Sequence, residues 1–202
     1  MADLSVGWLN CHVSACPTLT TERLTMRPFR AADVDPLFDI MTTDEVRSAF
    51  HVPDDFTRAN AWSVLTSFVG LWELKGVGHW ALEERDSRRF VGRAGLYWRT
   101  EPDWPGIEVG WMLHPGVWGR GYATEAGARA VEYGFDDVGE ERLFSVILPE
   151  NARSQAVARR LGFTPGEERV LPHFPSAAHC IWRLDRNAWS RPRQGARRLS
   201  GG

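Results

Sequence analysis

The chain of 202 residues has few cysteines, almost no lysine and no long apolar run. Its three cysteines are Cys11, Cys16 and Cys180, too few for a disulfide framework, and the nearby His12 completes no zinc-ligand spacing. We therefore expect free thiols and no metal. No apolar stretch approaches the ~20 residues of a membrane span, and the first residues lack the features of a secretory signal. These absences predict a cytoplasmic protein with no membrane partner.

The near-absence of lysine also excludes one class of phosphate site. Lys75 is the only lysine and is distant from the glycine-rich stretch, so a Walker-type loop with its Gly-Lys-Ser/Thr ending is excluded. The formal net charge of -2 argues against nucleic acid as a partner. Composition is that of a globular domain, which we expect over residues 20–186. An irregular arm is expected at 1–19 and a disordered Arg/Gly/Ser-rich tail at 187–202.

Hydrophobic periodicity predicts the element order β-α-α-β-β-β-α-β-α-β-β. Strands are expected at 23–29, 79–84, 89–98, 106–114, 142–149 and 179–185, with an irregular or strand-like stretch at 164–175, and helices at 31–50, 57–76, 122–135 and 151–163. Strands and helices in this order predict a single α/β domain built on a mixed sheet.

The stretch "GVWGRGYATEAG", residues 116–127, contains four glycines and joins a predicted strand to a predicted helix. Gly119 and Gly121 stand at the junction. The first turn of a helix has unpaired N–H groups and a partial positive charge, and glycine has no Cβ to keep a phosphate away. The stretch therefore predicts an anion-binding cradle. It is not a dinucleotide fingerprint, because Thr124 stands where that motif requires glycine.

The stretch "IEVGWMLHPGVWGRGYATEA", followed by "NARSQAVARRLGF", resembles the GNAT acetyltransferase superfamily. The similarity is greatest to the branch with the RimJ/RimL-type ribosomal-protein alanine N-acetyltransferases. It covers about residues 20–186, including "LTTERLTMRPF" at the start of the domain. The resemblance implies a mostly antiparallel sheet with helices on both faces and acetyl-CoA as co-substrate. The family's phosphate signature begins with Gln or Arg, whereas this chain has Gly116, so only backbone contacts are expected there.

The resemblance also implies which residues hold the coenzyme. Its pyrophosphate would lie on the N–H groups of residues 119 to 124. The implied contacts are Met112, Leu113, His114, Gly119, Arg120, Gly121, Tyr122, Ala123, Thr124 and Asn151. The backbone at Met112 and Leu113 would pair with the pantetheine amides like an added strand, where the strand often splays from its neighbour. Asn151 could cap the following helix as well.

Glu108 is the candidate general base for attack of an amine on the thioester. Because side chains alternate along a strand, Glu108 lies on the opposite face from the apolar Ile107 and Val109. The family often places a base on this strand, acting directly or through water. An exposed strand carboxylate or a salt-bridge partner is an equally good interpretation.

Ser154 is the candidate acid that protonates the departing thiolate. It precedes Val157 by three residues and Leu161 by seven, so helical spacing places it on the buried stripe with them. The alternative is a serine at a helix start that bonds local backbone. Among charged neighbours, Glu125 and Arg129 are predicted to form an i,i+4 ion pair without a role in the chemistry.

The sequence leaves the acceptor open. It implies an acetyl-CoA-dependent N-acetyltransferase acting by direct attack on a primary amine, either a protein N-terminus or a small molecule. His79 and His173 could line the acceptor site, and aromatic walls such as Trp111 would suit an apolar or cationic acceptor. A non-catalytic acyl-CoA-binding module and a GNAT toxin that acetylates aminoacyl-tRNA are the alternatives. Monomer and homodimer both stay open.

Overall fold

The computed structural model of the protein describes residues 16–101, 103–172 and 174–190. Eight strands form one sheet: β1 (Leu19–Thr20), β2 (Leu24–Arg27), β3 (His79–Glu84), β4 (Phe90–Tyr97), β5 (Glu108–Leu113), β6 (Arg142–Ile147), β7 (Thr164–Val170) and β8 (Ala178–Asp185). The helices are α1 (Val34–Met41), α2 (Asp44–Phe50), α3 (Arg58–Lys75), α4 (Tyr122–Asp136) and α5 (Ala152–Arg160).

The strands lie in the order β1-β2-β3-β4-β5-β6-β8-β7. All neighbours are antiparallel except β5 and β6, which run parallel. The predicted single α/β domain on a mixed, mostly antiparallel sheet is therefore confirmed. The parallel pair joins the two halves of the sheet, because α4 connects β5 to β6 as a crossover.

The first helical region differs from the prediction. The single helix expected at 31–50 is a short 3-10 turn followed by α1 and α2. The break follows from two threonines: Thr42 donates its hydroxyl to the Phe38 carbonyl at 2.9 Å, and Thr43 donates to Ile40 at 2.9 Å while its backbone is extended. The irregular or strand-like stretch expected at 164–175, which the predicted element order counts as a strand, contains the edge strand β7. Helical period alone did not predict the break between α1 and α2.

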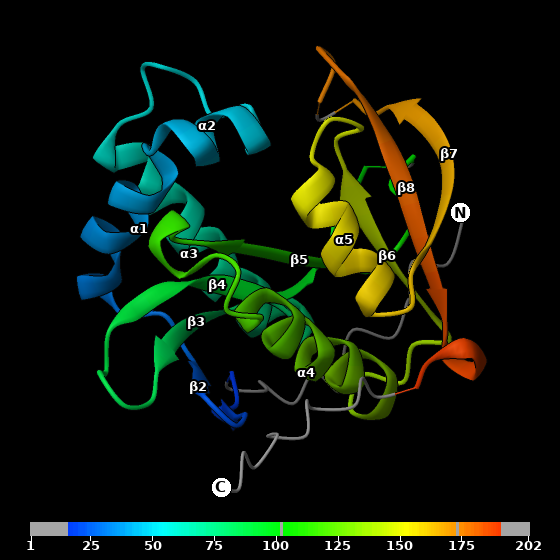
Figure 1. Cartoon of the computed structure of the whole chain (residues 1–202), viewed down its shortest axis with the longest axis horizontal. Coiled ribbons are helices and arrows are strands. Elements are labelled where there is room, and N and C mark those ends of the chain that lie inside the picture. The colour runs from blue at the N-terminus through cyan, green and yellow to red at the C-terminus, as the bar shows by residue number, and fades with distance from the viewer. Residues whose placement is uncertain (1–15, 102, 173, 191–202) are drawn as a thin grey trace, which may run out of the picture.

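Helices cover both faces of the sheet, as expected. On one face α4 packs against β4 and β5, where the small side chains Ala126 and Ala130 lie in a core with Val109. On the other face α1 and α3 pack in a second core that includes Phe68 and Met112. Figure 1 shows α4 in front of the strands, with α1 and α3 toward the other side. The alternation along β5 assigns odd positions to the first face and even positions to the second.

The strands β5 and β6 separate soon after they meet. Glu108 opposite Phe144 is the one paired position between them in the described chain, and Figure 1 shows the two strands diverging from there. Gly127 lets α4 and α5 approach across this gap, because a Cβ on it would lie 2.8 Å from the Leu161 Cδ1 atom. The splay opens the parallel pair toward solvent, which is where the functional groups gather.

A buried charge cluster fixes the N-terminal end of the domain. The Arg27 guanidinium binds Asp33 through both Nη atoms at 2.8 Å, and its Nε binds Glu83 at 2.9 Å. All three side chains are buried. The cluster joins β2, β3 and the turn before α1, so it holds the α1–α3 layer onto the sheet.

Parts of the predicted arm and tail belong to the folded domain. Cys16 packs against the first core, and the Pro17 carbonyl accepts a hydrogen bond from Trp80 Nε1 at 2.8 Å. After β8, Trp189 packs against Phe135 at 5.9 Å between ring centroids. The rest of both predicted segments, residues 1–15 and 191–202, lies outside the described residues.

Candidate active site

Two connected cavities lie at the splay between β5 and β6. The main cleft has a volume of about 750 Å³ and lies between the end of β5, the loop before α4, and α5. The inner cavity, about 460 Å³, lies on the α3 side of the sheet. Both are lined by Ala49, Phe50, Trp111, Met112, Asn151 and Ser154. A ligand in the main cleft can therefore reach a second molecule in the inner cavity at these shared residues.

The glycine-rich loop forms the floor of the main cleft, just before α4. Gly119 and Gly121 have φ values of 78° and 81°, in the left-handed region that favours glycine. A Cβ on Gly119 would meet no atom within 4 Å. Within the described chain, the amides of residues 119 to 124 make no backbone hydrogen bond. Unpaired N–H groups at the start of a helix of this length, with open space above them, form a site suited to a diphosphate.

Arg23 and Glu125 brace this loop from the side. Glu125 accepts hydrogen bonds from the Arg23 backbone at 2.8 Å, from Arg23 Nε at 2.7 Å and from the Thr21 hydroxyl at 2.5 Å. Arg23 Nη1 also donates to the Arg120 carbonyl at 2.7 Å. The predicted Glu125–Arg129 pair is therefore wrong. Glu125 points back toward the N-terminal strands, and Arg129 pairs instead with Glu132 at 3.6 Å.

Three of the residues implied as coenzyme contacts use their side chains elsewhere. The imidazole of His114 accepts a hydrogen bond from the Gly116 amide at 2.9 Å and does not line the main cleft. The guanidinium of Arg120 lies 3.6 Å from the Glu84 carboxylate, and the hydroxyl of Tyr122 donates to the same carboxylate at 2.6 Å. The Tyr122 ring does line the cleft, and the Arg120 amide belongs to the unpaired set.

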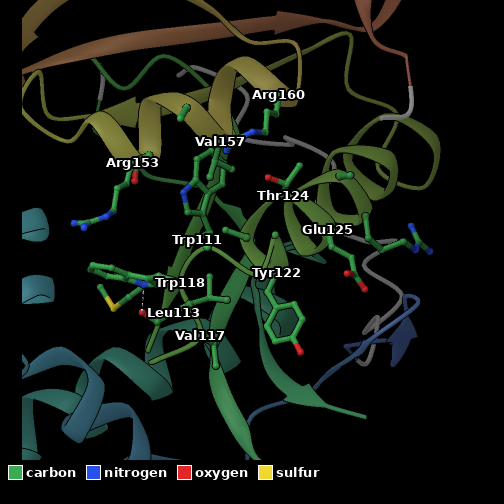
Figure 2. A pocket seen from close by; sticks show the side chains of 18 of the residues that line it. Trp111, Leu113, Val117, Trp118, Tyr122, Thr124, Glu125, Arg153, Val157 and Arg160 are labelled. Carbon is green, nitrogen blue, oxygen red and sulfur yellow. Dashed lines mark hydrogen bonds between the residues drawn. The ribbon is translucent and has the colours of Figure 1, made fainter. Parts of the chain in front are cut away.

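The main cleft has basic and aromatic walls whose contribution the sequence did not specify. Arg153 and Arg160 project from α5 into its lining, and Arg129 lies there on α4. The Arg153 guanidinium stacks on the Trp118 ring at 4.7 Å from the centroid. Figure 2 shows Arg153 and Trp118 together on one side of the cleft and Arg160 near Thr124 on the other. The sequence feature that could have indicated this role is the position of Arg153 and Arg160 outside the apolar stripe of α5.

The end of β5 is held by Trp118. Its indole Nε1 donates to the Leu113 carbonyl at 2.8 Å, the dashed contact in Figure 2. Met112 lines both cavities and Leu113 lines the main cleft. The β5 backbone beyond Glu108 has no registered β6 partner in the described chain, so its edge is open to an extended ligand.

Ser154 lies in the first turn of α5, at the junction of the two cavities. The helix begins after Asn151, whose Oδ1 accepts the Ser154 amide at 3.0 Å. Asn151 Nδ2 donates to the Ala49 carbonyl at 3.2 Å, so both ends of this amide are used within the protein. The Ser154 hydroxyl makes no hydrogen bond to the described residues. The side chain is therefore free to bond a ligand, unlike the local backbone bond of the alternative interpretation.

Glu108 lines the inner cavity, on the face opposite Val109. Burial raises the pKa of the Glu108 carboxyl to about 7, against the opposing charges of Arg99 and Arg93 and a backbone hydrogen bond from Val146. A carboxyl that titrates near neutral pH can accept a proton from an ammonium group and release it again. Its place in a cavity distinguishes it from an exposed strand carboxylate.

His79 also lines the inner cavity, as the sequence suggested, whereas His173 lies outside the described residues. Burial and the Arg93 charge lower the pKa of His79 well below its ordinary value, so the imidazole is neutral at pH 7. Arg93 Nη1 lies 2.9 Å from His79 Nδ1. Because a guanidinium only donates, Nδ1 accepts and the imidazole proton is on Nε2.

No group of three or more His, Cys, Asp or Glu side chains in the described residues could hold a metal ion. Cys16 and Cys180 are free thiols, and Cys11 lies outside the described part of the chain. None of the described helices is long and apolar enough to cross a membrane.

The comparisons with known proteins agree with this geometry. The family profile described as "Acetyltransferase (GNAT) domain" matches residues 23–164. An uncharacterized N-acetyltransferase, YoaA of Bacillus subtilis, is 27% identical over 158 residues, which cover 78% of this chain and 88% of YoaA. The crystal structure of an acetyltransferase from Agrobacterium tumefaciens is 30% identical with a TM-score of 0.72, covering 83% of this chain and 94% of that one. Mycobacterium smegmatis RimJ in complex with CoA-disulfide has a TM-score of 0.69 at 18% identity and covers 85% and 88%.

The fold and the family match thus place the protein in the acetyltransferase class. The chain belongs to the GNAT acetyltransferase family. This family uses acetyl-CoA as co-substrate, and the unpaired amides of residues 119 to 124, the open space over Gly119 and the basic side chains around the cleft fit its phosphates. The RimJ structure, at its low identity, supports the fold alone.

Proposed function

We propose that the protein is an N-acetyltransferase that transfers the acetyl group of acetyl-CoA to a primary amine by direct attack in a ternary complex. The observation that carries this proposal is the meeting of the two cavities at Ser154, Asn151 and Trp111. One cavity offers a phosphate cradle and the other a titratable carboxyl, so the two substrates can be held on opposite sides of one junction.

Each requirement of the reaction has a candidate group. Acetyl-CoA, when bound, supplies the activated acyl group. The cradle and Arg153 or Arg160 hold its phosphates in the main cleft, and the open edge of β5 orients its extended arm. The junction then aims the thioester at the inner cavity, which is a positioning effect of the fold.

The proton transfers follow from two side chains. Glu108 accepts the proton of the ammonium group, because a carboxyl with a pKa of about 7 is ionised in a large fraction at neutral pH. The amine nitrogen forms a bond to the acyl carbon as the carbon–sulfur bond breaks, and the acylated nitrogen releases its second proton to water. The departing thiolate takes the hydroxyl proton of Ser154, and this water returns a proton to Ser154, so no hydroxide is left. An amide, free coenzyme A and a proton on Glu108 are the products.

The acceptor is either a small amine or a protein N-terminus. The inner cavity, about 460 Å³, has a size suited to a small molecule. The likeness of the glycine block to the RimJ/RimL branch favours a protein N-terminus, which would insert its first residue into the same cavity.

The proposal is tested by thiol release with acetyl-CoA and a panel of amines, amino acids and short peptides, with mass measurement of the acetylated product. Calorimetry with coenzyme A runs in parallel. Saturable coenzyme binding together with an acetylated amine is the expected result. Binding without acetylation of any acceptor would favour the non-catalytic module, and acetylation confined to aminoacyl-tRNA would favour the toxin.

A further inference from the structure

The inner cavity has an excess of positive charge. Among the described residues, Glu108 is its only acidic lining residue, whereas Arg93 and Arg99 both line it. Burial lowers the pKa of His79 and of His179, the histidines of the described lining, so neither adds a charge at neutral pH. A polyamine or aminoglycoside would bring further positive charge into this space. The charge of the cavity therefore opposes the cationic acceptor that aromatic walls alone would allow.

Arg93 is the positive group with the fewest compensating contacts. Arg99 has a carboxylate beside it, with Glu101 Oε1 at 3.7 Å from its Nη1. Arg93 makes one hydrogen bond to the described residues, to the neutral ring of His79, and stacks over the Phe68 ring at 5.1 Å. Its Nε is buried without a partner, and its Nη2 makes no hydrogen bond to any described residue.

Burial lowers the pKa of Arg93 to about 10, against the opposing charges of Glu108 and Tyr97. At neutral pH the side chain nevertheless remains charged. The Arg93 side chain is half-buried, with its Nε buried, and a carboxylate that binds a guanidinium through two parallel hydrogen bonds would stabilise it in such a position. Glu108 lies near enough for its charge to act on Arg93, but no hydrogen bond or ion pair joins the two side chains among the described residues. The missing partner is a feature that a substrate can supply.

The position of Arg93 makes the partner an acceptor rather than the coenzyme. Arg93 stands on β4 opposite Met112, on the face that carries Glu108. It lines the inner cavity and does not line the main cleft, where the phosphate cradle lies. His79 lies next to it, with the Nε2 proton and no hydrogen-bond partner for it in the described chain. Two sets of donors therefore face the space in which the acceptor amine would sit.

Much of the remaining lining is apolar or aromatic, including Phe68, Tyr97, Trp111 and Phe174, and it also contains the serines Ser63, Ser67 and Ser145. A molecule that fills the cavity therefore needs three parts: an amine at the junction, an anionic group at Arg93 and an apolar body. We propose that the acceptor is a small primary amine that carries a carboxylate, such as a free amino acid with an apolar side chain, and that Arg93 binds this carboxylate. This inference rests on the proposed N-acetyltransferase activity and specifies its substrate class.

The experiment uses matched triads of acceptors. Each triad contains a free amino acid, its primary amide and the decarboxylated amine, with side chains from alanine to tryptophan. Rates of thiol release are expressed per concentration of uncharged amine, so that differences in amine pKa do not enter. In one or more triads, we expect kcat/KM for the free amino acid to exceed that for the amide and for the decarboxylated amine at least about tenfold. This difference corresponds to one charge-assisted pair, which the amide and the amine cannot form.

Arg93→Gln should remove this preference by raising KM for the free amino acid at least about tenfold, while the amide and the affinity for coenzyme A stay within about threefold. Arg93→Lys should restore part of it, since the charge returns without the planar fork. Arg183→Gln is the matched control, because Arg183 is an exposed residue of β8 paired with Asp185 outside both cavities.

Two results would overturn the inference. One is equal or better use of the amide, the decarboxylated amine or a peptide in every triad. The other is an equal loss on all acceptors in Arg93→Gln, which would make Arg93 a structural support for His79. If no acceptor turns over, the proposed function fails instead, and calorimetry of the triads on the coenzyme complex decides the inference. The inference is supported if the free amino acid binds more tightly than the amide and the amine and if Arg93→Gln abolishes this preference. It is refuted if the three compounds bind equally.

Discussion

Substituting Gly119 by alanine tests the phosphate cradle directly. Gly119 has a φ of 78°, and the methyl group of an alanine there would meet no atom within 4 Å. The protein can therefore accommodate the substitution at the cost of a left-handed conformation, roughly 1 kcal/mol. In a domain of this size that loss lowers Tm by about 2–4 °C. The methyl group would, however, occupy space that the diphosphate needs.

The expected loss of affinity is larger than the loss of stability. Displacing the diphosphate from one or two backbone donors removes about 1.5–3 kcal/mol for each charge-assisted hydrogen bond. The Kd for coenzyme A should rise roughly 10- to 100-fold. Isothermal titration calorimetry measures this Kd, and thermal denaturation of the same samples measures the cost to the fold.

Gly139→Ala is the matched control. Gly139 lies in the turn between α4 and β6, with a φ of 86° and no atom within 4 Å of an added Cβ. It lines neither cavity. The two variants should lose the same stability, and only Gly119→Ala should lose coenzyme affinity. Equal affinities in both variants would refute the assignment of the cradle to residues 119 to 124.

Three further substitutions test the chemistry and the scaffold. Ser154→Ala should lower kcat at least about tenfold, roughly 1.4 kcal/mol, with an unchanged Kd for coenzyme A. For Glu108→Gln, we expect wild-type activity to rise with pH through about 7 as the carboxyl loses its proton, whereas the variant lacks this rise. The ratio of wild-type to variant rates should therefore grow between pH 6 and 8, to a limit set by general-base catalysis, about 100-fold or more. Arg27→Met should cost about 3–5 kcal/mol of unfolding free energy, since it leaves Asp33 and Glu83 buried without their shared partner.

Matched variants outside the site control these three measurements. Ser87→Ala in the β3–β4 turn should retain full kcat, and an equal kcat in Ser154→Ala would remove Ser154 from the mechanism. Glu167→Gln on β7, where the side chain is 68% exposed, should leave the pH profile unchanged. A constant rate ratio across pH for Glu108→Gln would mean that the carboxyl is structural. Arg142→Met breaks an exposed pair and should cost at most about 1 kcal/mol, so a similar small loss for Arg27→Met would contradict the buried cluster.

The splay of β5 and β6 explains why the site lies where it does. A parallel pair buried on both faces normally stays hydrogen-bonded along its length. Here pairing between these strands is registered at one position, so backbone groups, the α4 N-terminus and the α5 N-terminus all meet one opening. Substrates then enter from two sides of the sheet, the main cleft on the α4 side and the inner cavity on the α3 side.

The sequence by itself determined most of the fold and the position of the glycine-rich loop before α4. The switch between period two and helical spacing separates β3, β4 and β5 from α3 and α4, because local burial patterns fix those elements. Gly119 and Gly121 indicated a junction before a helix where an anion could approach the backbone, since glycine has no Cβ. The prediction of one continuous helix at 31–50 was wrong, because two threonine hydroxyls end α1 without any change in the hydrophobic period.

Only the tertiary structure decided which charges are paired and which face a cavity. Glu125 matches an i,i+4 partner in the sequence, yet it binds Arg23 of the turn between β1 and β2, which is 102 residues away in the chain. Nothing in the sequence distinguishes Arg93 from the other arginines. The sheet places it beside a neutral histidine and on the same face as Glu108. Such pairings depend on burial and on contacts between distant segments, and for that reason no local pattern predicts them.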